Sequence, residues 1–283
     1  MIDLKSTPIR KAWSGFMIVI SALCAVACGA VLVTVVLYVV GKGYKALNWD
    51  FFTKLPLPVG MTGGGVANAI VGSFEIIGMA SLFAVPIGVM AGIYLALFGR
   101  GQLAASVRFY SDVLTGMPSI AVGMFAYALV VIPSGHFSAQ SAAVALSVIM
   151  LPIVVRTTEE AVRLVPGVIR EGALALGIPA WKATLMVTVP VARAGIVTGV
   201  LLAIARVAGE SAPLLFTAFG SQFWPHGLAS PTAALPLIIF QYAISPYADW
   251  VQIAWGCALV LVALVFTLNL IARFAFSGRV SAN

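Results

Sequence analysis

The chain has 283 residues, of which 61% are hydrophobic and only 9% are charged. Soluble domains carry about 25% charged residues, so this composition excludes a soluble enzyme and predicts lipid as the main surroundings. Because a spanning helix needs about 20 apolar residues, the length predicts an all-α bundle of about six spans without a sizeable soluble domain. The net charge of +7 fits basic cytoplasmic loops. The sequence contains no basic run with interleaved aromatic residues, which is the pattern that would indicate nucleic-acid binding.

The cysteines and histidines predict neither a disulfide framework nor a metal site. Cys24, Cys28 and Cys257 fall inside apolar stretches, where cysteine is a small packing residue. His136 and His226 occur in short polar stretches, away from other metal-ligating side chains.

The first spanning helix is expected over 13–41, after a basic cytoplasmic segment at 1–12. The residues before Cys28 loosely resemble a processing site, so a signal peptide is the competing interpretation. The apolar run continues well past Cys28, which is too long for a cleaved hydrophobic region, and we expect the helix to be retained.

Five further spanning helices are expected after a polar extracytoplasmic connection at 42–64. The first of them is longer than one bilayer crossing, so it is expected to tilt or to begin outside the membrane. A loop rich in Gly, Pro, Ser and Trp is expected at about 219–247, and a cytoplasmic tail at 277–283. The five helices are expected at 66–98, about 110–132, about 140–160, about 191–218 and about 249–275.

Three prolines fall inside these helices, where each removes one hydrogen bond and predicts a kink. They are Pro86, Pro118 and Pro152. Two glycine pairs, Gly88 with Gly92 and Gly195 with Gly199, predict close helix approach. Plain packing explains these pairs most simply, and a bundle with moving parts is the alternative.

The distribution of basic residues predicts the orientation of the bundle. Lys42, Lys45 and Lys54 alone fall in outer segments if the N-terminus is inside. The positive-inside rule therefore places both termini in the cytoplasm. The basic residues of the inner segments are then Lys5, Arg10, Lys11, Arg100, Arg108, Arg156, Arg163, Arg170, Lys182, Arg193, Arg273 and Arg279.

The inner stretch 156–190 is long, charged and partly apolar. Leu174, Ile178, Trp181 and Leu185 recur on one helical face. Gly177 and Pro179 interrupt that face, which favours a short helix–turn–helix. Its apolar face must be shielded from water, and it could lie on lipid headgroups or in a groove on another protein.

This stretch resembles the cytoplasmic loop of bacterial ABC importer permeases, whose pattern is EAA, three residues, Gly, nine residues, then Ile-x-Leu-Pro. Glu171-Gly172-Ala173 precedes Gly177 at the family's spacing, and Val187-Thr188-Val189-Pro190 follows nine residues later. Gly172, Val187 and Val189 depart from the pattern, each to a small or apolar residue.

The resemblance implies that the loop docks in a cleft of an ATP-binding subunit. The residues expected at this contact are Glu171, Ala173, Gly177, Trp181 and Pro190. Gly177 would permit the tight turn because it has no Cβ. No G-x-x-x-x-G-K-[ST] pattern occurs, so ATP and Mg are expected on partner subunits, with no cofactor and no catalytic residue in this chain.

Charged residues inside expected helices mark the candidate substrate path. Arg206 and Glu210 lie four apart in the fifth helix, on one face. Guanidinium offers a rigid fork of donors that matches an oxyanion, and Glu210 would hold that fork and compete with the anion. An internal ion pair without a transport role is the alternative. Glu75 and Asp112 are weaker candidates, for which a structural role is the simpler interpretation.

The run from Gly209 to Ala218, GESAPLLFTA, resembles the A-type permeases of phosphate importers, as do 112–120 and 92–96. The resemblance implies a type I ABC importer permease (MetI-like) architecture, with the permease core at 65–276 and the coupling loop at 164–190. It further implies a bacterial cytoplasmic membrane protein that passes phosphate by way of Arg206. The implied partners are a second related permease, two ATP-binding cassette subunits and an extracytoplasmic phosphate-binding protein.

Two other functions remain open from the residues alone. An importer of the same class could carry molybdate, sulfate or an amino acid, since the loop motif does not read the substrate. An ion-coupled carrier is the second alternative, but such carriers show paired broken helices in internal repeats, and the sequence shows no such pairing. A regulatory sensor would need an added soluble domain.

Overall fold

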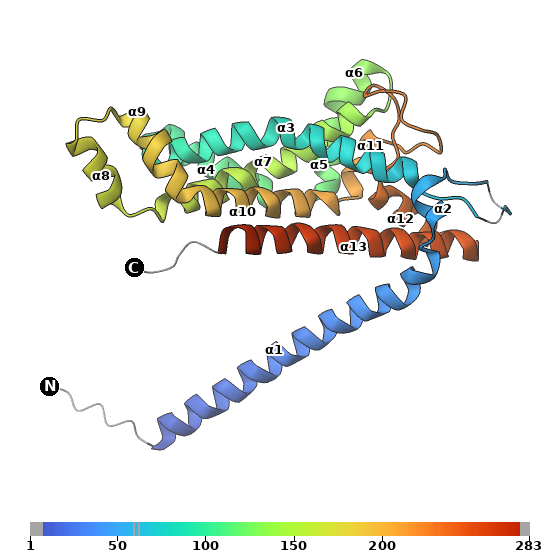
Figure 1. Cartoon of the computed structure of the whole chain (residues 1–283), viewed down its shortest axis with the longest axis horizontal. Coiled ribbons are helices and arrows are strands. Elements are labelled where there is room, and N and C mark those ends of the chain that lie inside the picture. Colours follow the sequence, from blue (N-terminus) through green and yellow to red (C-terminus); the bar gives the residue numbers. More distant parts are fainter. Residues whose placement is uncertain (1–7, 59, 62, 278–283) are drawn as a thin grey trace.

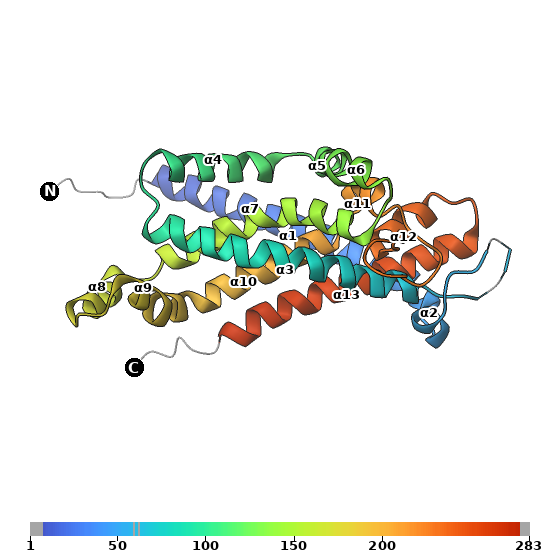
Figure 2. The ribbon, with the colours of Figure 1, turned by 90° about the horizontal axis from the view of Figure 1, so that it is seen from above.

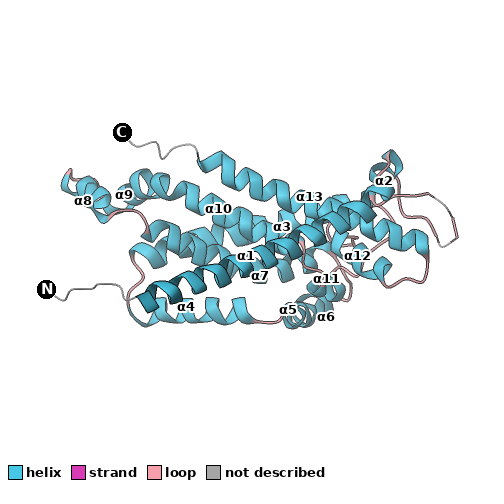
Figure 3. Ribbon diagram, turned by 90° about the horizontal axis from the view of Figure 1, so that it is seen from below, coloured by secondary structure: helices cyan, strands magenta, loops and turns pink. Residues whose placement is uncertain are grey.

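The protein is built from helices and short connections, as a computed structural model that describes residues 8–58, 60–61 and 63–277 shows. Figure 3 contains helices and loops but no strand in that part of the chain. The longer helices are α1 (Pro8–Gly43), α3 (Ala67–Leu97), α4 (Gly101–Gly116), α7 (Ala139–Arg163), α10 (Val189–Ala208) and α13 (Ala248–Ser277). The shorter ones are η1 (Tyr44–Ala46), α2 (Trp49–Thr53), α5 (Ser119–Ala126), η2 (Tyr127–Val131), α6 (Ile132–Ser134), α8 (Gly167–Ala175), α9 (Ala180–Ala183), η3 (Thr184–Thr188), α11 (Ala212–Thr217) and α12 (Leu235–Ala243).

Helices α3, α7, α10 and α13 run side by side along the long axis of the molecule (Figures 1 and 2). Apolar side chains of α3, α7 and α10 form one core with α11 and α12, centred on residues such as Ile76, Met150 and Leu214. Helix α4 flanks α7, whereas α1 meets α13 near one end and diverges from it toward Pro8 (Figure 1).

The two ends of the bundle differ in what they carry. Helices α8 and α9 project at one end, together with the start of α1 and the end of α13 (Figure 2). The other end holds α2 and α12, which pack with α13 around a second core that includes Phe51, Leu235 and Cys257. The helix–turn–helix predicted within 156–190 is therefore present as α8 and α9, on the same side as the start of α1 and the end of α13.

Within the residues that the structure describes, five helical segments are long and apolar enough to cross a membrane, and the bent pair of α4 with α5–α6 makes a sixth if it is one span. Helices α1, α3, α7 and α13 match the predicted spans closely, and Pro86 and Pro152 lie inside α3 and α7 as expected. The fold is the all-α transmembrane bundle that the composition predicts.

The predicted third helix, about 110–132, is wrong as one continuous element. The chain breaks at Met117 and Pro118, both with extended ψ angles, and it bends by 106° between α4 and the segment α5–α6. Proline disfavours helical geometry in the residue before it, so Met117 ends α4 instead of continuing it. Pro118 therefore separates two helices and does not lie inside one.

The predicted fifth helix and the loop after it also need correction. Helix α10 ends at Ala208, and a short break at Gly209 and Glu210 separates it from α11, in which Pro213 occupies the first turn. The expected loop at 219–247 contains the apolar helix α12. Its nine residues are too few to span a bilayer, so the length of the apolar run did not indicate a spanning helix there.

Both glycine pairs lie against α7, which confirms the predicted close approach. A Cβ atom on Gly88 would come within 2.8 Å of Val154, and one on Gly92 within 2.6 Å of the Thr158 Cβ. From the other side of α7, Gly195 faces Ala161 and Gly199 faces Thr157. Helix α7 is thus enclosed between α3 and α10 at backbone contact distance.

Candidate functional site

Arg206 and Glu210 sit where α10 ends. Arg206 lies in the last turn of the helix, and Glu210 follows in the break before α11, with its backbone N–H donated to the Val207 carbonyl at 3.2 Å. The Arg206 Nε and the Glu210 Oε1 are 3.6 Å apart, so the predicted pairing of the two side chains is present. Both residues were predicted within one helix, and that part is wrong, because Glu210 lies beyond the end of α10.

The pair lines a cavity of about 280 Å³ between three segments of the bundle. Helix α7 supplies one wall, the end of α10 another, and the broken segment of α4 and α5 the third. Most of the lining is apolar, and the polar side chains are Thr115, Ser119, Arg206 and Glu210. The other lining residues are Leu114, Met117, Ile149, Ile153 and Leu202.

Arg206 supplies the single positive side chain of this cavity. Its side chain is 60% exposed, and that of Glu210 is 17% exposed. Within the described part of the chain, the Arg206 guanidinium has no ion-pair partner other than Glu210, and that contact is longer than a hydrogen bond. The fork of donors is therefore open toward the cavity.

The break between α4 and α5 shapes the same cavity. Met117 and Ser119 lie on its wall at the point where the chain turns. The N-terminal end of a helix carries partial positive charge on its unpaired N–H groups, which favours an anion nearby. Non-helical backbone at membrane depth is tolerated where it lines a cavity, and this break meets that condition.

Asp112 is not part of the cavity. It binds Arg156 of α7 through two contacts, at 2.9 Å from Nε to Oδ1 and 3.1 Å from Nη2 to Oδ2. Glu75 is half-buried in α3, makes no ion pair within the described residues, and does not line the cavity. The structure thus brings Arg206 and Glu210 together and leaves both weaker candidates elsewhere.

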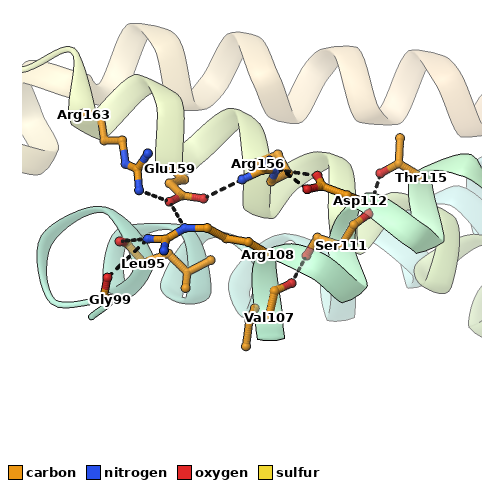
Figure 4. A network of polar contacts seen from close by, with 10 residues as sticks. All are labelled: Leu95, Gly99, Val107, Arg108, Ser111, Asp112, Thr115, Arg156, Glu159 and Arg163. Atoms are coloured by element: carbon orange, nitrogen blue, oxygen red, sulfur yellow. Dashed lines mark hydrogen bonds and ion pairs between the residues drawn. The ribbon is translucent and has the colours of Figure 1, made fainter. Parts of the chain in front are cut away.

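Asp112 and Arg156 belong to a network around Glu159, whose side chain is 1% exposed (Figure 4). The Glu159 carboxylate accepts from Arg108 at 2.7 Å and contacts Arg163 at 2.6 Å and Arg156 at 3.2 Å. A buried carboxylate needs such partners, because an unpaired one is strongly destabilising. The network fastens α4 to α7.

Arg108 extends this network to the end of α3. Its Nη2 donates to the carbonyl oxygens of Leu95 at 2.8 Å and Gly99 at 3.4 Å, so it closes the α3–α4 turn (Figure 4). Sequence reasoning missed Glu159, although its spacing from Arg156 and Arg163, three and four residues, was a signal for a helical ion-pair cluster.

The turn between α8 and α9 is built around Gly177, which has a φ of +78°. The Gly177 N–H donates to the Leu174 carbonyl at 3.0 Å, and the Ile178 N–H to the Ala173 carbonyl at 3.3 Å. These two bonds form a Schellman motif, which requires a left-handed residue that is most often glycine. The role of Gly177 in the turn is as the sequence predicts.

The other residues expected in the docking contact do not share one environment. Glu171, Trp181 and Pro190 are exposed, whereas Ala173 is buried within the chain at 7% exposure. The exposed apolar side chains of the α8–α9 segment are Val168, Ile169, Leu174, Leu176 and Trp181. Ala173 therefore packs inward beneath a segment whose outer side is apolar.

Comparison with known proteins places these features in a family. Residues 84–277 match the model of the binding-protein-dependent transport system inner membrane component family. The chain is 45% identical to the phosphate transport system permease protein PstA of Yersinia pestis, over 88% of this chain and 84% of that protein. It is 50% identical to PstA of Xylella fastidiosa over 83% and 82% of the two chains.

A further relative covers nearly the whole length. PstA of Pasteurella multocida is 43% identical over 95% of this chain and 96% of its own. Among solved structures, an inward-facing form of the MetNI methionine ABC transporter resembles the fold, with a TM-score of 0.59 and 20% identity over 74% of this chain and 95% of that one.

Proposed function

Because the chain belongs to the family of binding-protein-dependent transport system inner membrane components, and within it to the PstA phosphate transport system permeases, we propose that it carries inorganic phosphate inward as part of an ATP-driven importer. It is an integral inner-membrane permease subunit.

The observation that carries this proposal is the cavity with Arg206 on its wall. A guanidinium held among apolar side chains provides directed donors where few others compete for them. Hydrogen bonds from a charged donor to an oxyanion are among the strongest in proteins. The neighbouring carboxylate of Glu210 offsets part of that attraction, so an anion can leave as well as enter.

Coupling to ATP is assigned to α8 and α9. Their exposed apolar side chains, including Leu176 and Trp181, need a cover on the inner side of the membrane. We assign that cover to an ATP-binding subunit, one for each of two permeases. ATP and Mg would be held by those subunits, since this chain has no P-loop sequence.

The other partners follow from the family. A second, related permease would complete the passage, and an extracytoplasmic binding protein would deliver phosphate to the end that holds α2 and α12. The α8–α9 end, where α1 starts and α13 ends, would face the cytoplasm together with both termini.

Uptake by the reconstituted complex tests the proposal. Proteoliposomes with the binding protein outside and ATP inside would receive labelled phosphate, sulfate or molybdate. We expect ATP-dependent uptake of phosphate alone. Arg206→Ala should lower it by about 10- to 100-fold, because hydrogen bonds to charged groups contribute about 1.5–3 kcal/mol.

Arg193→Ala is the matched control, since Arg193 lies exposed on the same helix and does not line the cavity. Its uptake should stay close to that of the unaltered complex. ATP-dependent uptake of another anion would contradict phosphate as the substrate but would still support an ATP-driven importer. Uptake driven by an ion gradient without ATP would contradict the assignment of α8 and α9.

A further inference from the structure

The carboxylate of Glu210 lies on the wall of a cavity proposed to pass anions. An anion that approaches Arg206 must also approach Glu210, because the Arg206 Nε and Glu210 Oε1 are only 3.6 Å apart. Like charges at such distances repel, and the repulsion is stronger where water is scarce. A passage for anions in general would be better served by a neutral side chain at this position.

The geometry leaves room for both side chains to act on one ligand. Their contact is beyond hydrogen-bond distance, so neither is held in a closed, two-pronged pair. Thr115 already donates its hydroxyl hydrogen to the Ser111 carbonyl at 2.8 Å. Glu210 is consequently the strongest acceptor on the cavity wall, and Arg206 is the strongest donor.

This combination separates oxyanions by whether they carry a hydrogen. Phosphate near neutral pH retains P–OH groups, which can donate to a carboxylate, and deprotonated oxygens, which can accept from a guanidinium. Sulfate has the same tetrahedral shape but no hydrogen to donate. It would meet Glu210 with an oxygen lone pair, and the carboxylate would be left without a partner.

We propose that Glu210 makes this cavity selective for oxyanions that carry an acidic hydrogen, by accepting a hydrogen bond from the anion while Arg206 donates to its deprotonated oxygens. The inference rests on the proposed function and adds a selectivity step within the membrane. Sites built around a substrate hydroxyl reject analogues that lack it far more strongly than apolar pockets reject a change in size.

Anion binding to the permease complex without its binding protein tests this inference, because the binding protein would otherwise select the anion first. The complex would be placed in lipid nanodiscs, and phosphate binding followed through broadening of its phosphorus NMR signal. Sulfate and monofluorophosphate would compete. Monofluorophosphate is tetrahedral and carries no P–OH group at neutral pH, so it tests the role of the hydrogen without any mutation.

We expect phosphate to bind the unaltered complex at least about tenfold more tightly than either competitor, the change expected for one hydrogen bond to a charged group. Glu210→Gln should reduce that ratio toward one, since an amide can also donate to sulfate. Glu210→Asp keeps the carboxylate and should retain part of the preference.

The possible results separate this inference from the proposed function. In one result, Arg206→Ala abolishes phosphate binding while sulfate and monofluorophosphate bind the unaltered complex as tightly as phosphate does. That result would support the proposed phosphate passage and would overturn the selectivity role of Glu210. An unchanged ratio in Glu210→Gln has the same meaning. If the unaltered complex binds no phosphate, or if Arg206→Ala binds it normally, both are overturned at this cavity.

Discussion

Gly177 shows how one residue can set the shape of the segment assigned to ATP coupling. Its φ of +78° closes the Schellman motif at the end of α8 and turns the chain into α9. No atom lies within 4 Å of the place where a Cβ would stand, so space does not restrict the position. The restriction is the left-handed backbone itself, which other residues adopt at a cost of about 1–2 kcal/mol.

Gly177→Val should therefore disturb the turn without unfolding the bundle. We expect the native turn to lose about 5- to 30-fold in population, and ATP hydrolysis to proceed with less uptake per ATP. The ratio of phosphate taken up to ATP hydrolysed measures this in proteoliposomes. Gly172→Ala is the control, because that position in α8 has a helical backbone and open space. A ratio unchanged in Gly177→Val would contradict the coupling role.

At the scale of elements, the two broken segments define the cavity. The α4–α5 break at Pro118 and the α10–α11 break at Gly209 both border it. A proline in an apolar run predicts a disturbance but not its size, because a kink and a full break share the same local sequence. Tertiary contacts decide between a kink and a break, so the sequence predicted the pairing of Arg206 with Glu210 but not the cavity wall opposite them.

The close packing of α3 against α7 can be tested at two glycines of α3. Gly92→Ala would place a Cβ within 2.6 Å of the Thr158 Cβ and 2.7 Å of the Val155 carbonyl oxygen on α7. Overpacking of this kind costs about 1–3 kcal/mol, so we expect a lower midpoint of thermal unfolding in detergent. Gly78→Ala, on the same helix with open space around it, should leave the midpoint unchanged or raise it. Equal midpoints for both variants would show that the α3–α7 seam tolerates separation.

At the scale of the whole molecule, most of the architecture follows from composition and the length of apolar runs. Those signals predicted the bundle and the bounds of α1, α3, α7 and α13. They did not predict α12, which is short, or the Glu159 network, whose partners Arg108 and Asp112 come from a different helix. Contacts between distant segments leave no periodic trace in a single sequence.

Orientation in the membrane is a prediction at this scale. After replacement of the three native cysteines by alanine, single cysteines would be introduced at two exposed positions, His226 and Lys182. His226 lies in the segment that joins α11 to α12 and Lys182 lies in α9, and these two elements are at opposite ends of the bundle (Figure 1). A membrane-impermeant thiol reagent added to intact cells should label His226→Cys and leave Lys182→Cys unlabelled, because basic residues accumulate on the inner side. Inverted vesicles should give the opposite pattern. Labelling of Lys182→Cys in intact cells would reverse the proposed topology.

Helix α1 differs from the rest of the molecule in how its sequence is constrained. None of its most apolar stretch is buried against the chain, whereas its last turns are fitted to α13: Tyr38 packs edge-on against Trp255, the Lys42 carbonyl accepts from Gln252, and Gly43 faces the backbone of Trp255. Within this chain, the first part of α1 is therefore specified only by length and apolarity, and its last turns by individual side chains. Tolerance of substitution should therefore fall along α1 from its beginning to its end, because only its last turns are fixed to α13 by specific contacts.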